Sequence, residues 1–136
     1  MIVPDPSALL ALFNRREPAH AAVTEIVEGE PDPLIVSPYV LAELDYLVAT
    51  RLGVEAELAV LRELGGGAYH LEELAAGDLL DAAAVVERYR DQQVGVADAS
   101  IVVLADRHRT RSVLTLDHRH FSVLRPRAGG RFTLLP

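Results

Sequence analysis

Residues 95–117 read GVADASIVVLADRHRTRSVLTLD, and this stretch predicts a buried helix followed closely by a short strand. The helix is expected over residues 97–109. Its middle, Ile101–Ala105, is apolar nearly all round, which is typical of a helix enclosed by other elements. Ser112–Leu116 is a short apolar run that predicts a strand. The rest of the chain repeats this alternation of helix and strand.

Similar patterns on either side of this stretch predict further strands and helices. Strands are expected at residues 1–3, 34–36, 68–71 and 131–135, and helices at 7–14, 19–28, 38–51, 54–64 and 75–90. Short strands separated by helices predict an α/β fold, in which a central parallel sheet is flanked by helices on both faces. Ligands of such sheets bind beyond the carboxyl ends of the strands, so polar residues at those ends are the first candidates for function.

Composition excludes several classes of protein. The chain has 136 residues, of which 50% are hydrophobic and 24% charged, as in a folded globular domain. It contains no cysteine, which excludes a disulfide scaffold, a thiolate zinc site and a cysteine nucleophile. It also contains no lysine, which excludes a Schiff base and a P-loop. No signal peptide or membrane-spanning run is apparent, so a soluble, cytoplasmic protein is expected.

Charge is distributed unevenly along the chain. Residues 1–86 contain 4 arginines and 15 acidic residues, whereas residues 87–136 contain 9 arginines and 5 acidic residues. The late arginines can form either a solvated basic face or a surface that contacts nucleic-acid phosphates. Charge alone favours neither.

Four carboxylates occupy positions that solubility does not explain. Asp5 and Asp117 each follow a predicted strand, so both lie at the carboxyl edge of the sheet. Glu43 borders the apolar stripe of its helix, and Asp98 precedes Ile101 by three residues at the start of the buried helix. Singly, each acid can serve as a helix cap, a turn residue or an arginine partner.

Together, the four acids predict a metal site. Clustered carboxylates repel one another unless a cation lies among them or some are protonated, and no lysine is present to neutralise them. Mg²⁺ or Mn²⁺ with oxygen ligands would do so. Such a site can activate water and stabilise a phosphoryl group during its transfer.

These residues also carry a family resemblance. The chain resembles the PIN-domain ribonucleases, and specifically VapC-type toxins of bacterial toxin–antitoxin pairs, over nearly its whole length. The matching segments are DPSALLALF (residues 5–13), SPYVLAELDYLV (37–48), residues 95–117, and His120-Phe121. Their order and spacing are more specific than any single segment.

The resemblance implies a function and a set of site residues. It implies a single PIN domain over residues 1–136, a cytoplasmic homodimer, and a Mg²⁺-dependent endoribonuclease that cuts structured RNA such as transfer or ribosomal RNA. A VapB-type antitoxin would cover its groove. The expected metal-binding and catalytic residues are Asp5, Glu43, Asp98 and Asp117. Ser7 and Thr115 match hydroxyl residues that would orient a carboxylate or water.

Other residues receive supporting roles in this interpretation. Glu43 would bind the metal through water or act as the base. Arg107, Arg119 and Arg125 would hold flanking phosphates. The run His118-Arg119-His120 is expected on the surface or against RNA, since alternate residues of a loop diverge.

One departure from the family keeps an alternative open. Pro4 and Pro6 flank Asp5, where family members usually have an unbroken apolar strand, and proline is unusual in a central strand. A displaced Asp5 with weakened metal binding would leave an inactive PIN-fold binding module. Phosphotransfer receivers and haloacid-dehalogenase-like phosphatases are disfavoured because both need a lysine.

Overall fold

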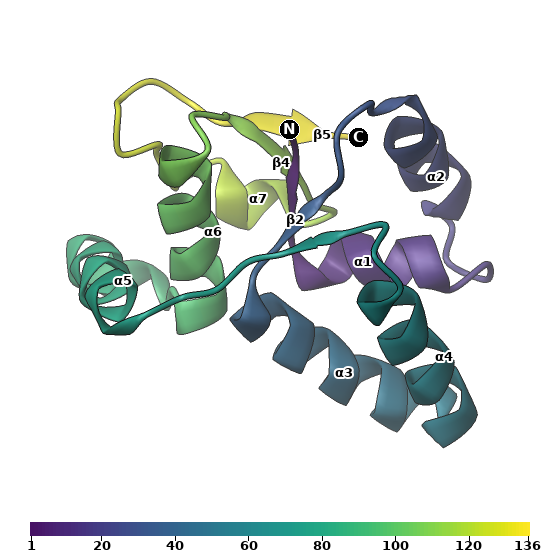
Figure 1. Ribbon diagram of the computed structural model, residues 1–136. Coiled ribbons are helices and arrows are strands. Elements are labelled where there is room, and N and C mark those ends of the chain that lie inside the picture. The colour runs from purple at the N-terminus through teal and green to yellow at the C-terminus, as the bar shows by residue number, and fades with distance from the viewer.

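Five short parallel strands form the centre of the computed structural model, which describes residues 1–136 (Figure 1). They are β1 (Val3–Pro4), β2 (Ile35–Val36), β3 (His70–Leu71), β4 (Ser112–Leu114) and β5 (Thr133–Leu135). β1, β4 and β5 pair in that order, and β2 pairs with β3. The N–H of Ile35 donates to the carbonyl oxygen of Ile2 at 3.0 Å, which joins the two groups in the spatial order β3-β2-β1-β4-β5.

Seven α-helices surround these strands. They are α1 (Pro6–Phe13), α2 (His20–Gly29), α3 (Pro38–Leu52), α4 (Val54–Gly65), α5 (Ala76–Arg88), α6 (Val96–Arg107) and α7 (His118–Phe121). Figure 1 shows α5 and α6 to the left of the strands, α1 and α2 to their right, and α3 and α4 below. The predicted α/β fold, with helices on both sides of a parallel sheet, is confirmed.

Helix α6 lies at the centre of the core. Ala97 and every residue of 99–105 are buried, and all of these side chains except that of Ser100 belong to one cluster of 30 buried hydrophobic residues. The apolar run therefore marks a helix covered on all sides, as expected. Such enclosure fixes the position of both ends of α6.

Local signals set the ends of α3. The Ser37 hydroxyl accepts a hydrogen bond from the Tyr39 N–H at 3.2 Å, and Pro38 occupies the first helical position. The same hydroxyl bonds the Ser100 hydroxyl at 2.6 Å, which ties the start of α3 to α6. Gly53 has a φ of +93°, a conformation that favours glycine, and it separates α3 from α4.

The predicted elements all exist, with shifted boundaries. The strands are shorter than expected, and β1 extends to Pro4 instead of ending at Val3. Helix α7 and a 3₁₀ turn at Arg90–Gln92 were not predicted, because elements of three or four residues have too few positions to show a periodicity.

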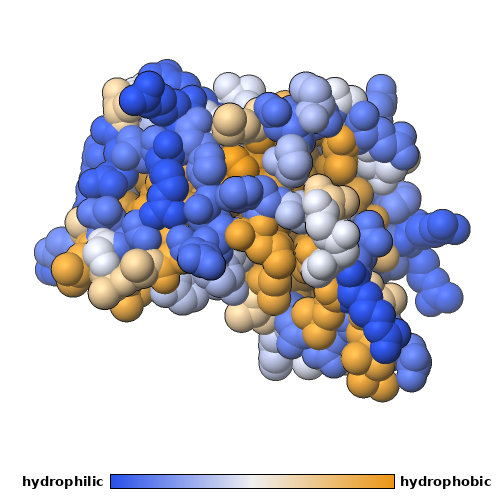
Figure 2. Space-filling view, viewed as in Figure 1, coloured by the Kyte–Doolittle hydropathy of each residue, from blue (hydrophilic) through white to orange (hydrophobic).

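Exposed apolar side chains gather on two helical regions. Figure 2 shows them over the lower part of α3 and α4 and again at α5. The most exposed aliphatic side chains of these helices are those of Val54, Leu79 and Leu80. None of the helices is long and apolar enough to cross a membrane.

Candidate active site

A pocket of about 330 Å³ opens at the carboxyl ends of β1 and β4. Its thirteen lining residues include all four predicted carboxylates, Asp5, Glu43, Asp98 and Asp117. They come from the end of β1, the middle of α3, the start of α6 and the segment after β4. The fold therefore brings together four acids that are up to 112 positions apart in the sequence.

Asp5 is the most enclosed of the four, at 4% exposure. It is the N-cap of α1, and its Oδ1 accepts from the Ala8 N–H at 2.9 Å. Both flanking prolines fit this arrangement. Pro6 occupies the first turn of α1, where a missing N–H costs nothing, and the Asp5 N–H donates to the Leu114 carbonyl at 2.9 Å, so pairing with β4 continues past Pro4. Asp5 therefore lies at the carboxyl end of β1 and lines the pocket with a proline on either side.

Two hydroxyl groups hold the Asp5 carboxylate in place. Thr115 donates to Oδ2 at 2.6 Å, and Ser7 donates to Oδ1 at 2.7 Å. Each hydroxyl also accepts a backbone N–H of the segment after β4, Thr115 from Asp117 and Ser7 from Leu116, both at 2.9 Å. Thr115 is itself fixed by its N–H, which donates to the Leu135 carbonyl at 2.7 Å. Ser7 and Thr115 thus lie where they orient a carboxylate.

The other three carboxylates stand on rigid helices or beside them. Asp98 lies in the first turn of α6, and its Oδ2 is 2.9 Å from His120 Nε2. Asp117 is the N-cap of α7, where its Oδ1 accepts from the His120 N–H at 3.1 Å. Glu43 projects from α3 next to the fully buried Leu44. The short helix α7 therefore links Asp117 to Asp98 through one histidine.

Burial raises the pKa of Asp5 above its ordinary value. The three hydrogen bonds that Asp5 accepts favour the charged form and lower the pKa, but they do not offset the loss of water, and the charge of Asp98 raises it further. Asp5 thus accepts three hydrogen bonds but forms no ion pair.

The pKa values of Glu43 and Asp98 are shifted in the same direction. Partial burial raises the pKa of Glu43, and the charges of Asp98 and Asp5 add to the rise. For Asp98, burial raises the pKa most; contact with His120 opposes it, and Asp117 adds to it. No arginine forms an ion pair with any of the four carboxylates. Several acids thus share one pocket with little compensation.

The donor set fits a hard divalent cation. Every candidate ligand is a carboxylate oxygen, the type that Mg²⁺ and Mn²⁺ prefer. Asp5 Oδ2 accepts one hydrogen bond and so keeps a lone pair for an ion. A cation would also remove the repulsion that raises these pKa values.

Comparison with known proteins shows the family of this chain. The family profile of the PIN domain matches residues 2–125. The chain belongs to the PIN-domain family. Over 132 residues it is 63% identical to Ribonuclease VapC26 of Mycobacterium tuberculosis, covering 97% of this chain and 98% of that protein. The predicted resemblance to VapC-type PIN domains is confirmed.

Solved structures show the same fold at low sequence identity. The crystal structure of M. tuberculosis VapC20, described as a sarcin-ricin loop cleaving toxin, has a TM-score of 0.77 at 20% identity and covers 83% of this chain and 87% of that one. VapBC2 from Rickettsia felis, bound to a DNA fragment from its promoter, has a TM-score of 0.64 at 17% identity, covering 98% and 97%. These likenesses establish the PIN fold.

The three predicted RNA-binding arginines of this PIN domain are not brought to the pocket rim together. Arg119 is exposed on α7, next to His120. Arg125 donates to the carbonyl oxygens of Ser122 and Leu124. Arg107 lies at the far end of α6 and binds acidic side chains there. Their role toward RNA stays a prediction.

Three titratable residues of the pocket were missed by sequence analysis, namely Glu17, Arg51 and His120. His120 was expected on the surface or against RNA, but its ring contacts Asp98 inside the pocket, whereas His118 is exposed. Arg51, near the end of α3, also lines the pocket. Its position eight residues after Glu43, two helical turns away on the same face, was the available signal.

Proposed function

We propose that this PIN domain is a Mg²⁺-dependent endoribonuclease and the toxin of a VapBC pair. The observation that carries the proposal is the convergence of four carboxylates, unpaired with any arginine, in one pocket at the carboxyl edge of the sheet. The identity to a protein named as a ribonuclease supports the reaction type. We expect structured RNA, such as transfer or ribosomal RNA, as substrate.

The side chains divide the work of phosphodiester hydrolysis. Asp5, Asp98 and Asp117 would hold the cation. When bound, Mg²⁺ or Mn²⁺ would supply Lewis-acid stabilisation of the phosphate charge. Glu43, with its raised pKa, would accept the proton of the attacking water. As the water oxygen bonds to phosphorus, the bond to the 3′-oxygen breaks and that oxygen leaves with a proton from solvent.

Other residues position these groups. Ser7 and Thr115 hold the Asp5 carboxylate in one orientation, and His120 does the same for Asp98. Arg51 supplies the positive side chain that lines the pocket and would contact a substrate phosphate. Arg119, exposed beside His120, would contact a flanking phosphate.

We further propose a VapB-type antitoxin partner, a homodimer and a cytoplasmic setting. Solved structures with this fold include toxin–antitoxin complexes, which supports the partner. Induced expression in a bacterial host should arrest growth, and co-expression of a VapB-type antitoxin should relieve the arrest. Light scattering of the purified chain would measure the oligomeric state.

Cleavage of total RNA by the purified protein tests the proposed activity. We expect discrete cleavage products with Mg²⁺ and none with EDTA. Asp98→Asn should abolish cleavage, and Asp106→Asn, which removes an exposed acid from the same helix, should leave it unchanged. Undiminished cleavage by a folded Asp98→Asn variant would refute the assignment. No cleavage by the wild-type protein under any divalent ion would favour the binding-module alternative.

A further inference from the structure

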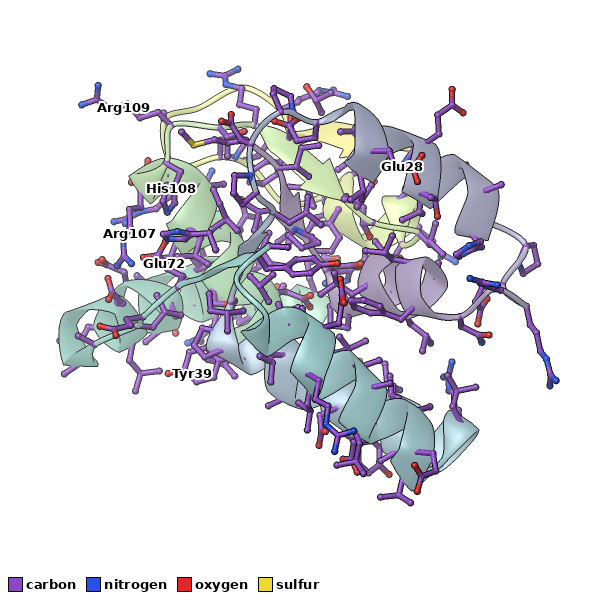
Figure 3. All side chains as sticks on the ribbon, turned by 45° about the vertical axis from the view of Figure 1, so that its right-hand side comes forward. Glu28, Tyr39, Glu72, Arg107, His108 and Arg109 are labelled. Carbon is purple, nitrogen blue, oxygen red and sulfur yellow. The ribbon has the colours of Figure 1, made fainter.

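A second group of metal-ligating side chains lies at the opposite end of α6. His70, Glu72 and His108 each place a ligand atom within 4.8 Å of the other two. His70 Nε2 is 3.1 Å from Glu72 Oε2, and His108 Nε2 is hydrogen-bonded to the same oxygen. Figure 3 shows Glu72 and His108 pointing toward each other from separate elements. The cluster is about 15 Å along the helix from Asp98.

Backbone geometry positions each member of this cluster. His70 belongs to β3 and Glu72 follows it, and residues two apart on a strand point to the same side. His108 is the C-cap of α6. The three ligands therefore come from two elements that sit in fixed positions, so their convergence is built into the fold.

The spacing of the three ligand atoms matches a zinc site. With bonds of about 2.0–2.1 Å, ligands of tetrahedral Zn²⁺ lie about 3.3 Å apart. The distance of 3.1 Å between His70 Nε2 and Glu72 Oε2 is already close to this value. Because all three ligand atoms lie within 4.8 Å of one another, the other distances need only a small change. Glu72 Oε2 is now hydrogen-bonded to both imidazole rings. An ion bound between these three atoms would take the place of the N–H protons of the two hydrogen bonds.

Neighbouring groups orient the Glu72 carboxylate. Arg107 donates to its other oxygen, Oε1, at 3.2 Å, and so leaves Oε2 to face the histidines. Asp78 binds the same guanidinium group and balances its charge. Support of a metal-binding carboxylate by a hydrogen bond to its second oxygen is common in metal sites.

The cluster is open to solvent on one side. The His70 side chain is 52% exposed, and a cavity of about 240 Å³ lies against both histidines. Three protein ligands and one free position allow an ion to enter and leave, with water completing the tetrahedron.

We propose that His70, Glu72 and His108 form a binding site for a first-row transition metal, with Zn²⁺ as its best match. Two imidazoles and one carboxylate suit Zn²⁺, in contrast to the all-oxygen pocket at the other end of α6. The ion would cross-link β3 to the end of α6 and stabilise the fold. This site is independent of the proposed nuclease activity.

Titration calorimetry with Zn²⁺, in the presence of excess Mg²⁺, tests this site. We expect one tight Zn²⁺ per chain in the wild type, in Asp98→Asn and in His118→Ala, which removes an exposed histidine outside the cluster. His70→Ala, at a half-exposed position, should fold normally and lose at least about a hundredfold in affinity. Co²⁺ should give visible absorption typical of tetrahedral coordination in the wild type and lose it in His70→Ala.

Thermal unfolding provides a second measurement that does not depend on enzyme activity. Zn²⁺ should raise the unfolding temperature of the wild type and leave that of His70→Ala unchanged. Zn²⁺ binding that is lost in Asp98→Asn but kept in His70→Ala would assign the ion to the acidic pocket and overturn the proposal. No Zn²⁺ binding by the wild type would show that the cluster is only a hydrogen-bonded contact.

Discussion

Acidic residues near the two ends of helix α6 have pKa values shifted in opposite directions. At the first turn, Asp98 shares a pocket with four other carboxylates, those of Asp5, Glu17, Glu43 and Asp117. Burial and neighbouring negative charges raise the pKa values of Asp98, Asp5 and Glu43. At the last turn, Arg107 contacts both Glu72 and Asp78, and His108 contacts Glu72.

The pKa values of these second acids are lowered. A hydrogen bond from Arg107 lowers the pKa of Asp78. Partial burial alone would raise the pKa of Glu72, but hydrogen bonds from His108 and Arg107 and the nearby histidine charges outweigh it. Acids that are paired with cationic side chains thus have lowered pKa values, whereas the pocket acids Asp5, Glu43 and Asp98, which no arginine pairs with, have raised pKa values.

Removing one carboxylate from each end gives the largest expected contrast. Asp5→Asn should reduce Mg²⁺-dependent RNA cleavage by more than about a hundredfold, since effects of 10–100-fold are typical of residues that only support a ligand. Glu72→Gln should leave the cleavage rate within about twofold. Single-turnover cleavage of one RNA by both variants makes this measurement. Equal losses in both would mean that the two ends are not functionally distinct.

Removing a supporting group should have an intermediate effect. Thr115→Val keeps the shape of a fully buried side chain but deletes the hydrogen bond to Asp5 and the one from the Asp117 N–H. The Mg²⁺ concentration needed for half-maximal cleavage should rise about 10–100-fold. Thr110→Val, whose hydroxyl is far from the pocket and bonds Met1, serves as the control. An unchanged Mg²⁺ requirement in Thr115→Val would contradict the positioning role.

The stability of the metal-free protein should change in opposite directions at the two ends. Asp98→Asn relieves repulsion among carboxylates and should stabilise the fold at pH 8. Glu72→Gln weakens the contacts with Arg107 and His108 and should destabilise the fold by about 1 kcal/mol. Urea unfolding in EDTA measures both changes. A destabilised Asp98→Asn variant would show that the pocket acids are already compensated.

The pH dependence of those two changes should also be opposite. The pKa of Asp98 is raised in the folded state, so its contribution to stability is present below about pH 4 and is lost as pH rises through the raised value. The stabilisation by Asp98→Asn should therefore be small at pH 4 and grow toward pH 8.

The pKa of Glu72 is lowered, so its contribution is present above about pH 4.5 and is lost as pH falls through the lowered value. The destabilisation by Glu72→Gln should shrink in acid. Unfolding curves at several pH values separate the two trends, and parallel trends would contradict the assigned directions.

The four predicted acids of the pocket could be found from the sequence because each one stands in a recognisable local pattern. Asp5 and Asp117 follow apolar runs, and Glu43 and Asp98 sit at helical spacing from buried side chains, so strand ends and helix periodicity sufficed to place them. The sequence predicted a parallel sheet but not the order of its strands, because strands of two or three residues carry no information on which neighbour they pair with.

Long-range pairing explains what sequence analysis missed. Arg107 was a natural candidate for phosphate, but its partners Glu72 and Asp78 lie 35 and 29 positions earlier in the chain. His120 reaches Asp98 across 22 positions through a four-residue helix that no periodicity reveals. Contacts of this kind follow from the assembled core and not from any local pattern.

The hydrogen bond from Thr115 to Leu135 gives the last strand an influence on the acidic pocket. β5 lies at the outer edge of the sheet. Its Leu135 carbonyl nevertheless accepts a hydrogen bond from the N–H of Thr115, whose hydroxyl donates to Asp5. An affinity tag fused after Pro136 is therefore only two hydrogen bonds away from Asp5, through Leu135 and Thr115. Tags placed before Met1 attach instead where the chain contacts Glu30, Asp32 and Thr110, away from the pocket, and are the better choice for assays.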